Sequence, residues 1–300
     1  MNVLITGSNG FVGKTLSKYL NNKNIDTFSL TRNPSSNSQK NDILMEDFYS
    51  EEEWLKVLVN IDVVIHLIAK THSKIDKEKD SLNSYRKVNV QITQALCNAI
   101  KNSSVKRLVF ISSIKVNGEF TLPGSPFSES SQTKPEDNYG KTKLEAEECI
   151  KNSFVKTNKE YVILRPPLLY GKNLKGNLHF LVKLLKKGVP LPFASINNSR
   201  SILTLELLSH IVLKSLDAEN LKNKIFLISN ETKYSLRGLI EKISEDISIT
   251  PRMFYFPEKI LRVLLTIIGR NDLSKKLFSN LEIDNSHMNK FIDLESKKYL

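Results

Sequence analysis

The sequence predicts an α/β protein, a doubly wound parallel sheet followed by a smaller C-terminal substrate-binding lobe. Over the first two thirds of the chain, short and continuously apolar runs alternate with longer helical patterns. This alternation is typical of a parallel sheet that helices cover on both faces. A glycine-rich turn follows the first apolar run, and no internal repeat or low-complexity linker interrupts the pattern.

The elements of the sheet follow one another in regular order. We expect strands at residues 3–6, 25–30, 62–69, 107–113 and 161–166, and helices at residues 11–20, 51–59, 80–101 and 139–152. Residues 117–137, rich in Pro, Ser and Glu, form a long loop after the C-terminal end of a strand. In an open α/β sheet, ligands bind at that edge.

After Tyr170 the pattern changes, and two shorter units follow. "GKNLKGNLHFLVKLLKKGVPLP" indicates a loop and a helix, and "ISNETKYSLRGLIEKISEDI" indicates a turn and a second helix. These units are too small to fold alone, so we expect a lobe that closes over the sheet edge. The predicted division is a dinucleotide-binding domain at 1–168 and a substrate-binding lobe at 169–300. A return of the chain to the first domain is left open.

The stretch "KILRVLLTIIG" at residues 259–269 is apolar but too short to span a membrane, and Arg262 interrupts it. We expect a packed amphipathic helix there, with peripheral membrane contact as the alternative. No other run approaches the length of a membrane span, and "MNVLITG" begins a strand where a signal peptide would stand.

Composition narrows the class of protein. The chain has 300 residues, 40% hydrophobic and 25% charged, with a formal charge of +12. The lysines are scattered and form no dense basic run, so we expect no nucleic acid partner, although a basic protein attracts an anionic substrate. Cys97 and Cys149 have no metal-ligand spacing, which predicts free thiols, no metal and a cytoplasmic location.

The first turn, "TGSNGFVG", has the spacing GxxGxxG between a strand and a helix. Gly7 permits the tight turn, Gly10 lets the backbone approach a pyrophosphate, and Gly13 allows the helix to pack closely on the strand. The helix start, with Phe11 and Val12, offers amide groups and a partial positive charge to phosphate. This turn predicts a dinucleotide site.

The end of the second strand indicates which dinucleotide binds. An acidic residue there would bind the ribose hydroxyls of NAD, whereas an arginine accommodates the 2′-phosphate of NADP. The chain has Thr31 and Arg32, and no acid before Asp42. We therefore expect NADP, with NAD as the alternative.

Tyr139 and Lys143 stand four residues apart in a helical pattern and therefore share one helix face. A cation beside a phenol favours the phenolate and lowers the tyrosine pKa from its usual value near 10. A tyrosine tuned in this way can exchange a proton with a sugar hydroxyl near neutral pH. Taken alone, the pair is more often an ordinary solvated face.

A serine at the end of a strand, the tyrosine–lysine pair and the glycine loop together resemble the extended short-chain dehydrogenase/reductase family, whose nucleotide-binding domain is a Rossmann fold. The resemblance covers at least residues 1–171 and includes "VIHLIA", "KVNV" and "RPPLLYG". It implies that Ser113 hydrogen-bonds the substrate oxygen and that Tyr139 transfers the proton. Lys143 would bind the nicotinamide ribose, and Ser112 would be structural.

The same resemblance implies further contacts with the cofactor. They are Asp47 and Phe48 at the adenine, Ala69 and Asn89 along the cofactor groove, and Pro166 near the nicotinamide.

The second half resembles the nucleotide-sugar branch, which includes UDP-glucose 4-epimerases and UDP-sugar 4-keto reductases. The resemblance implies a UDP-sugar substrate, contacted by Asn177 and Leu178 and by Arg200 at the diphosphate, and a homodimer. Leu168 departs from the family pattern, because many relatives have an asparagine there that contacts the substrate.

Three chemistries share this fold. Dehydration needs an acidic pair after the catalytic hydroxyl, and Ile114 and Lys115 cannot replace it. Arg32 favours net reduction, so we predict a 4-keto reductase of surface-polysaccharide biosynthesis. The alternative is a UDP-hexose 4-epimerase with tightly bound NAD. A remote alternative is a non-catalytic dinucleotide sensor or RNA-binding scaffold, because some members of the fold have such roles.

Overall fold

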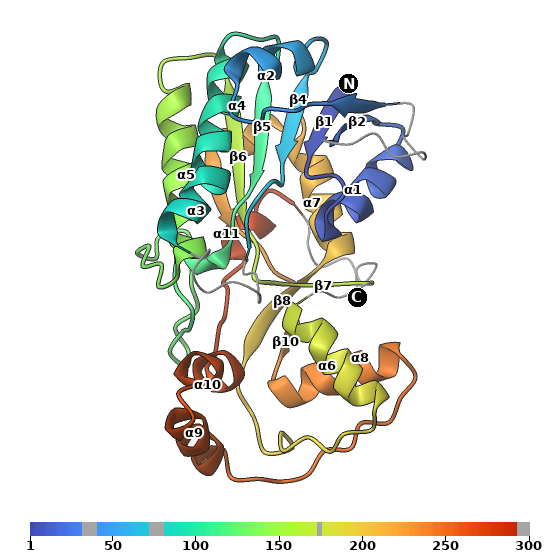
Figure 1. Ribbon diagram of the computed structural model, residues 1–300, viewed down its shortest axis with the longest axis vertical. Coiled ribbons are helices and arrows are strands. Elements are labelled where there is room, and N and C mark those ends of the chain that lie inside the picture. The colour runs from blue at the N-terminus through green and yellow to red at the C-terminus, as the bar shows by residue number, and fades with distance from the viewer. Residues whose placement is uncertain (32–40, 72–80, 173–175, 293–300) are drawn as a thin grey trace.

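The computed structural model describes residues 1–31, 41–71, 81–172 and 176–292. Its main body is a parallel sheet of seven strands flanked by helices, as Figure 1 shows, so the predicted fold class is confirmed. The strands, in their order across the sheet, are β3 (Asp42–Leu44), β2 (Asp26–Thr31), β1 (Asn2–Thr6), β4 (Val63–His66), β5 (Arg107–Ile111), β6 (Glu160–Arg165) and β9 (Lys224–Leu227).

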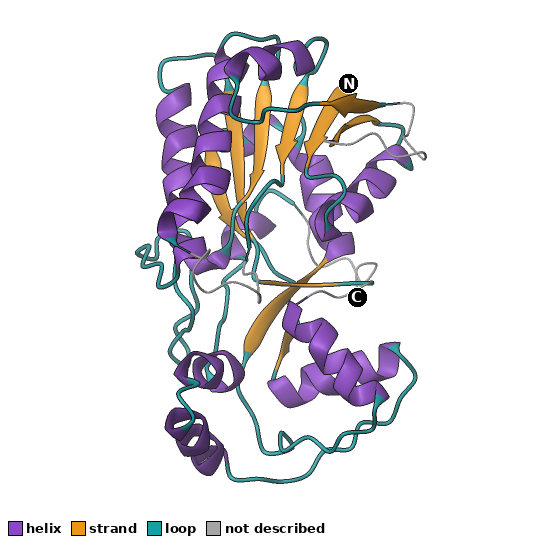
Figure 2. Cartoon of the chain, in the orientation of Figure 1, coloured by secondary structure: helices purple, strands orange, loops and turns teal. Residues whose placement is uncertain are grey.

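Side chains of the interior strand β1 alternate between two hydrophobic clusters, one on each face of the sheet. Val3 and Ile5 belong to the cluster under α1 (Phe11–Asn21) and α7 (Leu205–Ser215). Leu4 belongs to the cluster on the opposite face. The helices of that face are α2 (Glu51–Val57), α4 (Ile92–Lys101) and α5 (Asn138–Phe154). Figure 2 shows these helix layers around the strands.

The helix predicted at residues 80–101 is not one continuous α-helix. It consists of α3 (Leu82–Arg86), a π-helical segment (Lys87–Gln91) and α4. The wider turn includes Asn89, whose buried side chain hydrogen-bonds Lys70 and Thr142 rather than solvent. Such π segments often mark functional positions.

A second, three-stranded sheet begins the lobe below the main sheet (Figure 1). Its strand β8 (Arg200–Thr204) runs parallel to β7 (Leu168–Tyr170) and antiparallel to β10 (Lys233–Tyr234). The lobe's helices α6 (Gly176–Lys186) and α8 (Leu236–Asp246) contribute to a hydrophobic cluster of their own. The lobe therefore has a separate small core.

The chain returns to the main sheet after it has entered the lobe. Strand β8 leads directly into α7, which packs beside α1, and β9 extends the main sheet beyond β6. A second return is made by α11 (Ser286–Asn289). There His287 stacks on Phe226 of β9, with ring centres 5.2 Å apart.

The last two helices before that return are α9 (Glu258–Ile267) and α10 (Asn271–Phe278). They lie apart from the main sheet, at the far end of the molecule in Figure 1. The predicted helix at residues 259–269 forms and packs on α10 through one face, where Arg262 lies over the Phe278 ring, but none of the residues of α9 is fully buried. Among the described residues, no helix has the length and hydrophobicity of a membrane span.

Candidate active site

The glycine loop between β1 and α1 is tightly closed. Gly7 has φ +71°, a conformation that side chains disfavour, and Gly10 precedes the first turn of α1 in an extended conformation. At Gly13, a Cβ atom would lie 2.4 Å from the Gly7 carbonyl oxygen and 2.5 Å from the Ser8 Cα. Only glycine at position 13 allows the helix to approach the loop this closely.

The loop fits the phosphates of a dinucleotide. In the described structure no side chain caps the start of α1, and its first turn contains no acidic residue. The amide groups and the positive end of the helix dipole are thus available to an anion. The hydroxyl of Ser8 is buried and has no hydrogen-bond partner among the described residues, as expected of a group that awaits a ligand. Phe11 and Val12 begin the helix and are half-buried.

The amide of Asn89 fixes the loop after β4. Its Oδ1 accepts a hydrogen bond from the Lys70 amide at 2.6 Å, and its Nδ2 donates to the Lys70 carbonyl at 3.2 Å and to Thr142 Oγ1 at 3.0 Å. Ala69, next to Lys70, is half-buried in that loop. Asn89 thereby joins the loop of Ala69 to helix α5, and direct contact with a cofactor stays a prediction for both residues.

Asp47 and Phe48 lie in the turn that leads into α2. The Asp47 carboxylate accepts a hydrogen bond from the Tyr49 amide at 2.8 Å, and the Phe48 ring meets Trp54 edge-on. Arg32, on which the choice of NADP rests, lies outside the described residues.

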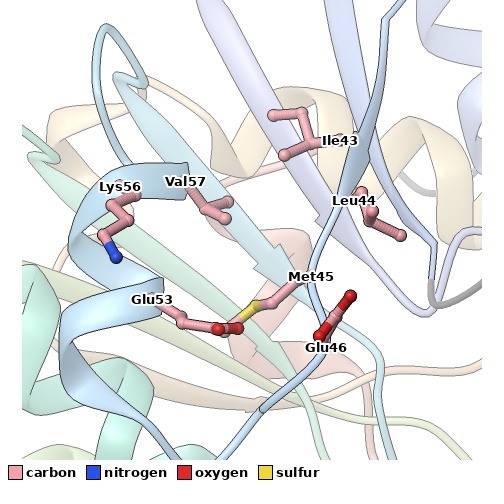
Figure 3. A pocket seen from close by; sticks show the side chains of 7 residues that line it. All are labelled: Ile43, Leu44, Met45, Glu46, Glu53, Lys56 and Val57. Atoms are coloured by element: carbon pink, nitrogen blue, oxygen red, sulfur yellow. The ribbon is translucent and has the colours of Figure 1, made fainter.

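A shallow pocket of about 290 Å³ lies close to this turn, and Figure 3 shows its lining. It lies between β3 and α2, at the edge strand of the sheet, while β5 is four positions further along. The pocket is therefore separate from the reaction site that the sequence predicts. Its lining residues are Ile43, Leu44, Met45, Glu46, Glu53, Lys56 and Val57.

Ser113 follows β5 and caps a short 3-10 turn, Ile114–Val116, with its Oγ accepting from the Lys115 amide at 3.3 Å. The Ile114 amide donates to the carbonyl of the buried Pro166 at 2.9 Å. On the other side, a Cβ atom at Gly140 would lie 2.6 Å from the Lys115 carbonyl oxygen. These contacts bring the turn of Ser113, the end of β6 and the first turn of α5 together.

Tyr139 projects from the first turn of α5, which Asp137 caps by accepting a hydrogen bond from the Gly140 amide at 2.7 Å. Burial of the phenol, the negative charge of Asp137 and the nearby hydroxyl of Tyr85 all raise the pKa of Tyr139. The expectation that this pKa is held down is therefore wrong for this structure.

Lys143, which was expected to lower the pKa of Tyr139, is itself deeply buried. Its side chain is fully buried, and its Nζ lies 3.8 Å from the centre of the Phe110 ring. Burial lowers the pKa of Lys143 to about 7, against the opposing effect of the Glu147 carboxylate. A lysine that is only partly charged at neutral pH is a weak source of stabilisation for a phenolate.

His66, at the end of β4, lies on the same buried side as Lys143. Its Nδ1 is 2.8 Å from Thr6 Oγ1 and its Nε2 is 3.0 Å from Thr93 Oγ1, so both ring nitrogens have partners. Burial and then the Lys143 charge lower the pKa of His66 to about 3. This histidine is therefore neutral and polar, and it adds no positive charge beside Lys143.

A buried ion pair behind the site was not predicted. Arg165 donates to both carboxylate oxygens of Glu147, at 2.9 and 2.6 Å, and to Asn117 Oδ1 at 3.0 Å. Ser112 also donates to Glu147, which agrees with its expected structural role. The signal in the sequence was the helical spacing, because Glu147 follows Lys143 by four residues and lies on the same face.

In the lobe, Arg200 begins β8 and is half-buried. Its Nη1 donates to the Ser279 carbonyl at 2.7 Å, and burial lowers its pKa against the opposing charge of Glu119. Leu178 packs in the hydrophobic cluster of the lobe. Asn177 lies in α6, and its side chain is outside the described structure. Their contacts with a substrate stay predictions.

Comparison with known proteins places these features in context. The profile of the NAD dependent epimerase/dehydratase family matches residues 3–203. A UDP-glucose 4-epimerase of Vibrio cholerae is 34% identical over 288 residues, which are 95% of this chain and 88% of that protein.

Two further proteins are similar to the chain. The N-acetyl-alpha-D-glucosaminyl-diphospho-ditrans,octacis-undecaprenol 4-epimerase of Escherichia coli O157:H7 is 31% identical over 193 residues, covering 62% of this chain and 54% of that one. The crystal structure of the UDP-glucuronic acid 4-epimerase from Bacillus cereus, in complex with UDP-glucuronic acid and NAD, has a TM-score of 0.76 at 19% identity. The match covers 98% of this chain and 93% of that one.

Proposed function

The chain belongs to the NAD dependent epimerase/dehydratase family, and from this membership we propose that it is a UDP-sugar 4-epimerase. The resemblance to the nucleotide-sugar branch of the short-chain dehydrogenases is thereby confirmed, and the protein is an enzyme. The observation that carries the proposal is its 34% identity, over 95% of the chain, with a UDP-glucose 4-epimerase. The solved neighbour, with NAD and a UDP-sugar bound, supports both ligands.

A nicotinamide dinucleotide held at the glycine loop of Gly7, Gly10 and Gly13 would supply reversible hydride transfer at C4 of the sugar. Tyr139, in its phenolate form, takes the proton of the C4 hydroxyl, while Ser113 Oγ hydrogen-bonds the same oxygen and holds it towards the Tyr139 oxygen. The ketone then presents its other face, and Tyr139 gives the proton back. Because the hydride and the proton both return to the sugar, only the configuration at C4 changes over the cycle.

The buried frame around α5 supports this chemistry. The Glu147–Arg165 pair and the Asn89–Thr142 hydrogen bond fix α5 against the sheet, and Asp137 fixes its first turn. The side chains at positions 139 and 143 are therefore presented from a rigid helix. Fixed geometry of this kind lowers the barrier for a proton transfer.

The 4-keto reductase that the sequence favoured stays the second candidate. Its supporting observation is Arg32 at the position that reads the 2′-phosphate of NADP, since net reduction commonly uses NADPH. The names of the similar proteins favour the epimerase and NAD instead.

One assay separates the two candidates. The purified protein is incubated with UDP-glucose, UDP-galactose or UDP-N-acetylglucosamine, without added cofactor, and the products are resolved by chromatography. The proposal expects interconversion at C4 and a dinucleotide retained by the protein in native mass spectrometry. If the protein carries no dinucleotide and oxidises one NADPH for each 4-keto sugar, it is the reductase.

The E. coli relative is named for a sugar linked to a polyprenol through a diphosphate. The same assay therefore includes N-acetylglucosamine diphosphate carried by a short polyprenol. If the protein turns over only this substrate, the proposed epimerisation at C4 stands, but the substrate is a lipid-linked sugar and not a nucleotide-sugar.

A further inference from the structure

Helix α9 exposes a continuous apolar stripe. Ile260, Val263, Leu264 and Ile267, with the C-cap residue Ile268, follow the spacing i, i+3, i+4, i+7, i+8, which places them on one helix face. Their side chains are between 47% and 74% exposed, far more than aliphatic residues of a packed helix.

The orientation of this stripe is fixed by the opposite face. Arg262 pairs with Glu258 at 2.7 Å, and its guanidinium lies 5.0 Å from the centre of the Phe278 ring of α10. Leu261 and Leu265, on the same side as Arg262, are half-buried. Contact with α10 therefore holds one face of α9 and turns the stripe outward.

Aromatic and basic residues border the stripe. Phe254 and Tyr255 precede the helix and are exposed, and Lys259 and Arg270 lie exposed at its two ends. From residue 254 to residue 276 the sequence has five basic residues and two acidic ones, a net charge of +3. An apolar stripe with aromatic and basic flanks matches the interface of an anionic bilayer.

We propose that α9 binds to the surface of an anionic phospholipid membrane, with its apolar stripe inserted between the lipids and its basic flanks at the phosphate groups. Ten helical residues extend about 15 Å, so the helix lies along the surface rather than across it. The inference concerns a binding surface and does not depend on the proposed activity.

A second copy of the chain fits the stripe less well. A stable interface buries roughly 800 Å² on each partner, whereas one face of a ten-residue helix offers roughly 200 to 300 Å². The positive flanks of two copies would also repel each other, while anionic lipids attract them.

The location of α9 gives the proposal a consequence. Figure 2 shows the strand arrows of the main sheet pointing towards the lobe, and Figure 1 shows α9 at that same end of the molecule, to one side of α6 and α8. A membrane bound through α9 would therefore lie at the same end of the molecule as the C-terminal edge of the sheet, where the turn of Ser113 stands.

The test is flotation of the full-length protein with vesicles of phosphatidylethanolamine and phosphatidylglycerol in equal parts, and with vesicles of phosphatidylcholine alone. We expect the wild type to float with the anionic vesicles and to lose binding as salt is raised. The triple variant Val263→Ser, Ile267→Ser, Ile268→Ser should bind about tenfold more weakly or worse. Because these side chains are exposed, the variant should fold, which circular dichroism and its activity on free substrate would verify.

Matched variants separate the stripe from general effects. Val59→Ser, Leu122→Ser, Val155→Ser removes similarly exposed aliphatic groups elsewhere and should bind like the wild type. The pair Lys259→Glu, Arg270→Glu should weaken binding by about fivefold or more per residue. The control pair Lys18→Glu, Lys101→Glu changes net charge equally, and at exposed positions away from α9.

Three results would overturn the proposal. The first is no flotation of the wild type with anionic vesicles, and the second is equal loss in the stripe variant and its control. The third is a wild-type dimer that does not float and that the stripe variant alone converts to a monomer by light scattering, which would make the stripe a contact between copies. None of these three results would change the outcome of the C4 assay, so the membrane proposal and the proposed activity fail independently.

Discussion

Lys115 and Asp137 form an ion pair that joins the turn of Ser113 to the first turn of α5. The Lys115 ammonium also binds Glu119 at 3.0 Å. Asp137 raises the pKa of Tyr139, and we expect the positive charge of Lys115 beside Asp137 to offset part of that effect. One lysine thus holds the two halves of the candidate site together and adjusts their electrostatics.

Lys115→Met should shift the tyrosine limb of the pH profile of kcat/KM to higher pH, because Asp137 loses its compensating charge. A shift of one unit would lower the phenolate fraction at neutral pH about tenfold. Asp137→Asn should shift the limb the other way, since asparagine still caps the helix but has no charge. Lys115→Arg should resemble the wild type.

The double variant Lys115→Met, Asp137→Asn completes this comparison. If electrostatics dominates, its profile should return towards that of the wild type, because both charges are gone. A lower kcat with an unmoved profile in Lys115→Met would instead mean that the lysine only supports the fold.

Lys143→Met should make folding stability less dependent on pH. The pKa of Lys143 is about 7 in the folded protein and 10.5 as its ordinary value. Between these values the unfolded chain holds more protons, so this lysine makes stability rise with pH and costs most below pH 7. Urea unfolding from pH 6 to pH 10 should show a flatter curve for the variant and a gain at low pH. The same slope in both proteins would contradict the buried, partly neutral lysine.

Tyr139→Phe should lower turnover by about 10² to 10⁴, because it removes the proton that the phenol transfers. The ring still fills its site, so the dinucleotide should bind almost as before. The two measurements are steady-state turnover and fluorescence titration of the cofactor. Activity above half of the wild-type value would rule out Tyr139 as the proton-transfer group.

Arg32→Asp should weaken NADPH more than NADH, because it removes a partner of the 2′-phosphate and adds a repelling carboxylate. A difference of about 1.5–3 kcal/mol suits one charge-assisted hydrogen bond. Titration of both cofactors measures it, with Arg32→Lys as the control that keeps the charge. Equal losses would show that this arginine does not read the phosphate.

Arg200→Ala should weaken binding of UDP and raise KM for the UDP-sugar, with little effect on the dinucleotide. The guanidinium also anchors the Ser279 carbonyl, so the variant tests two roles at once. Arg200→Lys separates them, because it keeps a positive charge but lacks the guanidinium fork. Calorimetry with UDP is the measurement, and an unchanged affinity for UDP in the alanine variant would rule out Arg200 as the diphosphate contact.

The sheet could be predicted from the sequence because buried parallel strands appear as continuous apolar runs. The runs at 3–6 and 107–113 correspond to β1 and β5, and the glycine turn lies between β1 and α1. The strands β3, β7, β8, β9 and β10 were not predicted, and three of them (β3, β7 and β10) have only two or three residues, which carry no period. The π-helical segment was not predicted, because its residues have no sequence pattern that distinguishes them from the α-helices on either side.

The proximity of the turn after Ser113 to the helix that carries Tyr139 and Lys143 could be predicted as well, but the electrostatics of these residues could not. Helical spacing places Lys143 near Tyr139, yet it does not tell that the lysine packs over Phe110 or that Glu147 pairs with Arg165. Burial decides the sign of each pKa shift, and burial comes from contacts remote in sequence. For α9, the helical spacing of apolar residues predicted that the apolar face is packed. The spacing alone could not show that this face is exposed in the described structure.

The position of β9 bears on how the nascent chain folds. The strand β6 gains its outer neighbour only when residues 224–227 have been synthesised, and α7, which shields the apolar side of α1, comes just before them. Until then, a ribosome-bound chain displays an unpaired strand edge and an uncovered helix face, both of which favour aggregation. The first 168 residues, although they carry the glycine loop and Tyr139, are therefore expected to need chaperones or the rest of the chain to stay in solution.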